Sequence, residues 1–237
     1  MEQYQDIIQI IALSMGVAWA SGLNLYAAIL TLGIAGSTGN IELPVQLEIL
    51  QDPTVLMAAG FMFCVEFFAD KLPGVDTGWD ALHTFIRIPA GAFLAASAVG
   101  DTSAAMELAA AIAGGTLTAG THMTKAGSRL LINTSPEPVS NWTASFAEDF
   151  AVIGGLILAI NNPIAFIILL VVFIALALWL LPKLWRGIKL MFNKIRGWFG
   201  GAPAEELKHG DADRSEQIAE QIGENLQQLD APGKPTN

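Results

Sequence analysis

Ionisable residues stand inside long apolar stretches of this sequence, where a charge is costly unless it meets a partner or water. Glu66 and Asp70 are four residues apart, so a helix would present both carboxyl groups on one face. Asp80, His83 and Arg87 follow at spacings of three and four, which brings an acid, an imidazole and a guanidinium to one helical face. Such groups can bind and release protons or cations, or they can form a static ion-pair network.

A second set of charged residues has the opposite balance. His122, Lys125 and Arg129 repeat the spacing of three and four without an acid, and Glu148 and Asp149 open a later apolar stretch. Pairing between these cations and the acids of neighbouring helices is the structural alternative for most of the set. Glu66, His122 and Glu148 lie deeper in their predicted helices, where burial favours the neutral form of a carboxyl group and suits a proton relay.

Two apolar runs contain a small residue followed by a polar one, at Gly22-Leu23-Asn24 and at Gly120-Thr121-His122. We expect each to interrupt its helix and to expose backbone groups to a substrate. The runs also match each other, since residues 21–24 align with 119–122 and residues 65–69 with 147–151. Two units of three helices would have opposite orientations, so the match predicts a 3+3 inverted repeat, with shared membrane composition as the alternative explanation.

Two loops offer oxygen ligands: residues 70–80 (DKLPGVDTGWD) and residues 133–142 (NTSPEPVSNW), which include Glu137. Oxygen ligands suit a hard cation such as sodium, calcium or magnesium, whereas turn formation and helix capping are the alternative. Neither loop has a known metal-binding spacing, and the chain lacks the common nucleotide, hydrolase and metalloprotease motifs. The sequence therefore assigns no cofactor and no catalytic residue, and it favours a protein that is not an enzyme.

The elements that must position these residues are membrane helices. Of 237 residues, 53% are hydrophobic and 14% charged, whereas roughly 25% of a soluble domain is charged. Crossing a bilayer takes about 20 mostly apolar residues, and six runs approach that length: 7–35, 53–69, 82–99, 104–124, 144–160 and 163–181. We predict an all-α integral membrane domain over residues 1–182, with four or five spans as the alternative because some runs are short or polar.

Lysine and arginine gather on one side of the predicted membrane. Five of them follow the last run between residues 183 and 196, while the predicted outside loops at 36–52, 100–103 and 161–162 contain none. This pattern predicts a multi-pass protein with both termini in the cytoplasm. Residues 183–200 mix basic and aromatic side chains as an interfacial amphipathic helix would, with anionic lipids at 183–199. Residues 201–237 are polar and acidic, which predicts a disordered tail that offers a docking surface for a protein partner.

Two long runs, ADKLPGVDTGWDALHTFIRIPAGAFLA (69–95) and THMTKAGSRLLINTSPEPVSN (121–141), resemble a bacterial membrane protein family of unknown function, domain of unknown function 4126. The resemblance extends over roughly residues 10 to 182. The family pattern includes the basic residue at Arg87, the His-x-x-Lys-Ala-Gly of residues 122–127 and the Ser-Pro-Glu-Pro of residues 135–138. The resemblance implies a protein of the bacterial inner membrane and supplies no activity.

The function that these residues favour is a small transporter or channel for an ion or small polar solute. Glu66 and Glu148 would carry coupling protons or cations, while Arg87, Lys125 and Arg129 would hold an anionic group or balance the acids. A homodimer is expected, because about 180 membrane residues make a thin bundle. Binding to nucleic acid is not expected.

Two other functions stay open on the sequence alone. One is a non-catalytic scaffold or assembly subunit that docks through residues 183–237. The other is an inner-leaflet enzyme or scramblase that acts on lipid phosphates with His83 or His122 and the neighbouring cations.

Overall fold

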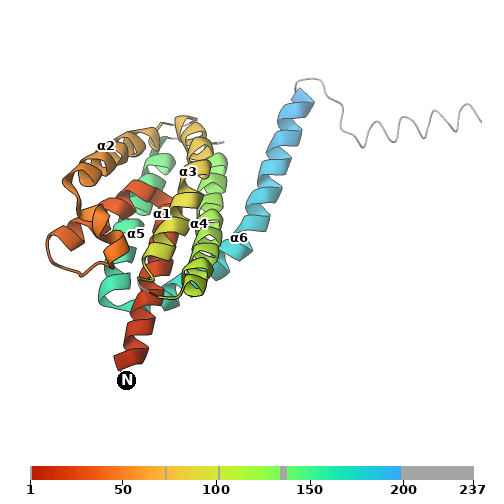
Figure 1. The fold of residues 1–237 in the computed structure, drawn as a ribbon. Coiled ribbons are helices and arrows are strands. Elements are labelled where there is room, and N and C mark those ends of the chain that lie inside the picture. Colours follow the sequence, from red (N-terminus) through yellow and green to blue (C-terminus); the bar gives the residue numbers. More distant parts are fainter. Residues whose placement is uncertain (1, 73, 101, 134–137, 199–237) are drawn as a thin grey trace, which may run out of the picture. The chain divides into compact units, whose positions relative to one another are not determined.

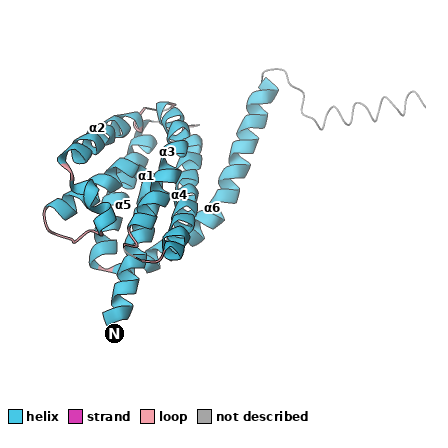
Figure 2. Ribbon diagram, in the orientation of Figure 1, coloured by secondary structure: helices cyan, strands magenta, loops and turns pink. Residues whose placement is uncertain are grey.

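The computed structural model describes residues 2–72, 74–100, 102–133 and 138–198, and over these residues it contains helices and no strand (Figures 1 and 2). The elements are α1 (Glu2–Ser37), the short 3-10 helix η1 (Val45–Gln51), α2 (Pro53–Ala69), α3 (Val75–Ser97), α4 (Ala104–Ile132), α5 (Pro138–Asn161) and α6 (Pro163–Trp198). The prediction of an all-α protein is confirmed.

Helix α1 occupies the middle of the bundle, and α2, α3, α4 and α5 all pack against it (Figure 1). The most apolar segment of α1 is 72% buried inside the protein, whereas the corresponding segments of α5 and α6 are 22% and 17% buried. Trp19 joins α1 to α6, because its ring meets Phe166 and Phe173 edge-on at centroid distances of 6.1 and 5.8 Å. The exposed apolar side chains of α5 and α6, such as Phe150 and Leu169, form the kind of surface that lipid covers.

Three segments among the described residues are long and apolar enough to cross a membrane: Tyr4–Ser37, Val139–Asn161 and Pro163–Leu190. Elements η1 and α2, which meet at an angle of 67°, add a fourth span if they are counted together. Helices α3 and α4 have 23 and 29 residues, which is long enough for a bilayer, but they carry the charged residues of the candidate site. Membrane-type helices are therefore present, while a total of six spans stays a prediction.

Several helices extend beyond the apolar runs that predicted them. Helix α3 begins at Val75, α5 begins at Pro138 and α4 continues to Ile132. Hydropathy detects only the apolar part of a helix, whereas these extensions contain polar residues that bond to other helices. The additional turns thus bring charged side chains from different helices to one end of the bundle.

The last helix continues past its predicted end. Helix α6 runs through Pro182 to Trp198. Residues 183–198 of the predicted separate interfacial helix (183–200) therefore form the last turns of α6. The predicted acidic tail, residues 201–237, lies outside the described residues.

Candidate functional site

The backbone of α1 is broken at Asn24, whose φ of −149° and ψ of 101° are extended rather than helical. The predicted interruption at Gly22-Leu23-Asn24 is therefore present. The side-chain oxygen Oδ1 of Asn24 accepts a hydrogen bond from the backbone N–H of Ala27 at 2.9 Å, as an N-cap does. In an unbroken helix that N–H would bond to the carbonyl of Leu23. The break consequently releases backbone carbonyl groups inside the bundle.

Cations from two other helices bond to the released carbonyl groups. Lys125 Nζ donates to the carbonyl oxygen of Leu23 at 2.9 Å, and Arg87 Nη1 donates to that of Gly22 at 3.5 Å. Helix α4 can approach this closely because Gly22 has no side chain: a Cβ atom there would lie 2.7 Å from the carbonyl oxygen of Thr118. Gly22 thus allows α4 to pack closely against α1, whereas Asn24 caps the second half of α1.

The second predicted interruption is wrong, because α4 passes through residues 120–122 as a continuous helix. Gly120 faces open space, whereas Gly22 is tightly packed, so the two glycines matched in the predicted repeat have different surroundings. The ring of His122 cannot cap a helix as Asn24 does, since its Nδ1 accepts a hydrogen bond from Arg87 Nη1 at 3.2 Å and its Nε2 bonds to α3. Because arginine can only donate, His122 is neutral in this arrangement.

Lys125 is the centre of a buried ion-pair cluster. Its ammonium nitrogen lies 2.9 Å from Asp70 Oδ2, 3.3 Å from Glu148 Oε2, 3.5 Å from Glu66 Oε1 and 3.9 Å from Asp80 Oδ1. These acids come from the end of α2, from α3 and from α5. One lysine on α4 thereby connects the four acids.

Arg87 closes one end of the cluster. Its Nη2 lies 2.5 Å from Glu66 Oε1 and its Nη1 lies 3.3 Å from Asp80 Oδ1. The side chains of Arg87 and Glu66 are both fully buried. Each of the two acids leaves its other oxygen without a hydrogen-bond partner among the described residues, and so does Nε of Arg87. The Arg87 end is therefore incompletely bonded.

Arg129 closes the other end, where both oxygens of Glu148 are bonded, while Oδ1 of the more distant acid Asp70 has no partner among the described residues. Its Nη2 and Nε bond to the two oxygens of Glu148 at 2.7 and 3.3 Å. Its Nη1 donates to the carbonyl oxygens of Asn141 and Asp70 at 3.0 and 3.1 Å, and also to the side-chain oxygen of Asn141. A guanidinium with donors in a fixed fork suits this arrangement better than an ammonium would.

The cluster has more acids than cations. It contains three cations and four acids, a formal charge of −1, and consists of Glu66, Asp70, Asp80, Arg87, Lys125, Arg129 and Glu148. Only Glu148 has appreciable exposure, at 16% of its side chain. A buried excess charge is unfavourable, so the cluster has capacity for one more positive charge. No group of three or more His, Cys, Asp or Glu residues in the described part of the chain has a geometry that could hold a metal ion.

Asp149 and Lys71 lie next to the cluster without joining its ion pairs. Asp149 Oδ1 accepts a hydrogen bond from Asn24 Nδ2 at 3.0 Å, and its Oδ2 has no partner among the described residues. Lys71 Nζ lies over the ring of Phe67, 2.9 Å from its centroid, and 4.4 Å from that of Phe146. The aromatic rings thus hold a buried ammonium that has no acid within salt-bridge distance in the described structure.

His83 turns away from the charged residues that share its helical face. Asp80 and Arg87 meet as the spacing predicts, but the ring of His83 bonds to the hydroxyl of Tyr26 at 3.1 Å and to the carbonyl of Trp79 at 2.9 Å. A carbonyl oxygen only accepts, so Nδ1 carries a proton, and in the neutral ring Nε2 accepts from the tyrosine hydroxyl. His83 therefore joins α3 to α1 and does not belong to the ion-pair cluster.

The two oxygen-rich loops meet at a hydrogen-bonded contact. Asn133 Nδ2 donates to both carboxyl oxygens of Asp76, at 2.8 and 2.9 Å, and the backbone N–H of Gly74 donates to Asp76 at 2.9 Å. Sequence reasoning expected capping or cation binding from Asp76 and did not foresee this pairing. Glu137, the acid of the second loop, lies outside the described residues.

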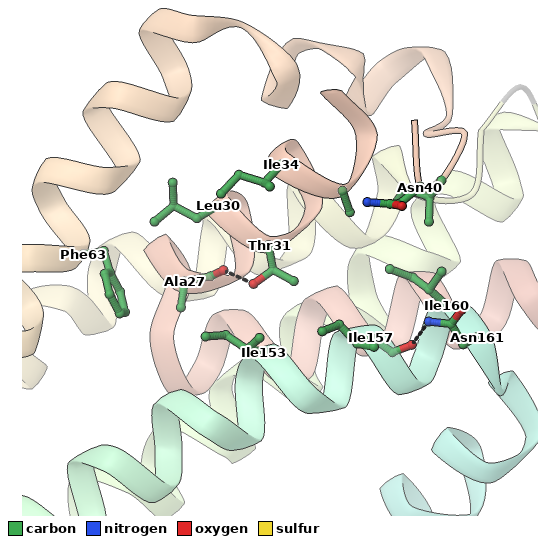
Figure 3. A pocket seen from close by; sticks show the side chains of 12 residues that line it. Ala27, Leu30, Thr31, Ile34, Asn40, Phe63, Ile153, Ile157, Ile160 and Asn161 are labelled. Atoms are coloured by element: carbon green, nitrogen blue, oxygen red, sulfur yellow. Dashed lines mark hydrogen bonds between the residues drawn. The ribbon is translucent and has the colours of Figure 1, made fainter. Parts of the chain in front are cut away.

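An apolar pocket of about 560 Å³ lies between α1 and α5, and Figure 3 shows their side chains facing each other across it. It is lined by Ala27, Leu30, Thr31, Ile34, Ala35, Asn40, Ile41, Phe63, Ile153, Ile157, Ile160 and Asn161. Sequence reasoning missed this pocket, because apolar side chains that line a cavity have the same composition as those that face lipid.

The pocket adjoins the buried polar residues. Three of its residues lie about one helical turn from a polar one: Ala27 from Asn24, Phe63 from Glu66 and Ile153 from Asp149. The break in α1, the Arg87 end of the cluster and Asp149 thus all lie about one helical turn from residues of the pocket.

A family model described as a domain of unknown function (DUF4126) matches residues 11–183, a range that contains every residue of the ion-pair cluster, Asn24 and Asp149. No curated protein and no solved structure matches the chain.

Proposed function

The chain belongs to the DUF4126 family, described as a domain of unknown function, and we propose that it is a small membrane transporter or channel for an ion or small polar solute. The observation that carries the proposal is the ion-pair cluster against a broken helix. Charged groups cost several kcal/mol each to bury, and the cluster retains seven of them inside a bundle with membrane-type helices.

A static ion-pair network accounts for these features less well. Hydrophobic residues of similar volume stabilise a core as well as a buried ion pair does, and a bundle that only needs stability has no use for a break at Asn24. Broken helices with released carbonyl groups are typical of transport sites, where backbone groups contact the transported species. The unbonded oxygens of Glu66 and Asp80 add capacity for a proton or cation at the same place.

The pocket supplies one half of a pathway. It begins at Asn40 and Ile41, in a loop that the charge pattern places outside the cytoplasm, and extends along α1 and α5 toward Asn24 and Asp149. In this proposal a solute passes from the pocket to the released carbonyl groups and to the incompletely bonded Arg87 end of the cluster. The orientation, in a bacterial inner membrane with both termini in the cytoplasm, is part of the proposal.

The six spans, the 3+3 inverted repeat and the homodimer are finer parts of the same proposal. The transport function does not depend on the repeat, because the site uses Asn24 and has no equivalent break in α4. A lipid-phosphate enzyme is less favoured, since Arg87, Lys125 and Arg129 are all buried and paired with acids, which leaves no cation of the cluster to bind a phosphate.

The test is ion flux through the purified full-length protein in liposomes, with imposed gradients of protons, sodium and potassium. We expect Glu66→Gln to abolish flux, because it removes the charge of the acid with an unbonded oxygen. Glu107→Gln is the matched control, since Glu107 is an exposed acid at the start of α4 and should leave flux unchanged. Absence of flux under every gradient, from a protein with its native unfolding temperature, would contradict the proposal and favour the scaffold function.

A further inference from the structure

Asp149 differs from the other buried acids in its partners. Glu66, Asp70, Asp80 and Glu148 each have a lysine or arginine nitrogen within 4 Å. Asp76 has no ion pair either, but its oxygens accept from the side chain of Asn133 and from backbone N–H groups. Asp149 has a single hydrogen bond among the described residues, from a neutral amide.

The orientation of that amide is fixed by the break in α1. Because Oδ1 of Asn24 accepts from the backbone N–H of Ala27, its Nδ2 must point to Asp149. One carboxyl oxygen of Asp149 is therefore bonded in either protonation state, whereas the other, Oδ2, has no partner. Asp149 is 92% buried, and one neutral donor compensates the negative charge of its carboxylate poorly. A proton on Oδ2 neutralises the group and so removes the free-energy cost of the buried charge.

The charged groups around Asp149 do not compensate it by direct contact. They are Lys125 on α4 and Asp70 and Lys71 at the end of α2, while α1 contributes the uncharged Asn24. None of the cations forms an ion pair with Asp149. Lys71 bonds instead to Ser145 and to the backbone of Phe67, and Lys125 to the acids of the cluster.

Asp149 is also close to the pocket. Ile153, one turn further along α5, lines the pocket, and so does Ala27, whose N–H is capped by Asn24. A proton delivered by water from the pocket could therefore reach Asp149 beside the ion-pair cluster, whose formal charge of −1 favours onward transfer of the proton.

We propose that Asp149 is the site that takes up and releases the coupling proton, at the junction of the pocket and the ion-pair cluster. Uptake forms an O–H bond at Oδ2 with a proton from hydrated pocket water, and release returns that proton to water or to an acid of the cluster. The coupling role depends on the proposed transport function, whereas binding of the proton to Asp149 does not.

The experiment is infrared difference spectroscopy of the full-length protein in lipid while the pH is lowered. We expect a carbonyl band of a buried, protonated carboxylic acid to appear and to shift in heavy water. Asp149→Asn should remove this band and keep the fold, because an asparagine still accepts from Asn24 and resembles the neutral acid. Glu107→Gln, on an exposed acid, should leave the band in place.

Three outcomes separate the two proposals. Loss of the band in Asp149→Asn, together with proton flux reduced to that of empty liposomes, supports the inference. A band that persists in Asp149→Asn and disappears in Glu66→Gln overturns it and moves the proton to the cluster. A band that depends on Asp149 in a protein without any flux retains the proton site and contradicts the transport function.

Discussion

Replacement of Arg87 by methionine tests how strongly the incompletely bonded end of the cluster holds the bundle together. Arg87 is fully buried on α3 and connects it to three other helices, through Glu66 at the end of α2, the carbonyl of Gly22 on α1 and the ring of His122 on α4. Methionine has a similar length and no charge. The substitution therefore removes the guanidinium with little change in volume and leaves two acids without their nearest cation.

The expected cost is about 3–5 kcal/mol of unfolding free energy, because removal of one partner leaves the charge of the other buried and uncompensated. Removal of both charges of the closest pair should cost less. In Arg87→Met/Glu66→Leu the only acid left short of a cation is Asp80, which keeps Lys125 at 3.9 Å. We expect the double variant to recover at least about 2 kcal/mol relative to Arg87→Met alone.

The assay is reversible unfolding in detergent micelles, followed by circular dichroism, for the parent, both single variants and the double variant. Arg87→Lys is an informative fourth variant, since it keeps the charge but not the fork that reaches Glu66 and Asp80 together, and it should lie between parent and Arg87→Met. If the losses of the two single variants add in the double variant, the two residues do not interact and the assignment of the cluster is refuted.

Three further predictions concern the packing around the site. Gly22→Ala should lower the unfolding free energy by about 1–3 kcal/mol, because a Cβ has no room against α4. Gly120→Ala lies in open space and should be neutral or stabilise by up to about 1 kcal/mol. Equal effects of the two variants in denaturant titrations would refute this difference. Asn24→Ala should cost about 0.5–2 kcal/mol through loss of the cap on the second half of α1, and Asn24→Ser, which keeps a capping oxygen, should cost less. Asn133→Ala should speed hydrogen exchange of amides at the start of α3, because it removes two hydrogen bonds to Asp76; an unchanged exchange rate would show that the contact does not hold this segment.

Much of the fold follows from sequence because apolar runs and helical spacing are local properties. The runs locate α1 to α6, and the spacing of Asp80 and Arg87 places them within ion-pair distance. The break at Asn24 was also predictable, since an amide two residues after a glycine can cap a new helix. The same logic failed at His122, where the side chain is committed to Arg87 and α3 and the helix continues.

The rest of the site depends on which helices are neighbours, and a single sequence does not contain that information. The contact between Asn24 and Asp149 joins residues 125 positions apart. The spacing of His83 places it with Asp80 and Arg87, yet its ring bonds to Tyr26 on α1, because a side chain on the edge of a helical face can turn to either neighbour. The pocket escapes detection for a different reason, which is that its apolar lining resembles a lipid-facing surface.

The structure separates two carboxyl groups that the sequence treats alike. Glu66 and Glu148 both lie inside a predicted apolar run, so equal roles in transport are the natural expectation from sequence, and both lie near Lys125 in the structure. Yet both oxygens of Glu148 are bonded to Arg129, whereas Glu66 has one oxygen bonded and one without a partner. A carboxylate with both oxygens bonded to an arginine holds helices together. A carboxylate with one unpartnered oxygen can accept a proton or a cation there. Within one cluster, the Arg129–Glu148 pair therefore has the bonding of a structural clamp, whereas the Arg87 end, next to the break in α1, has the unpartnered oxygens that the proposed transport would use.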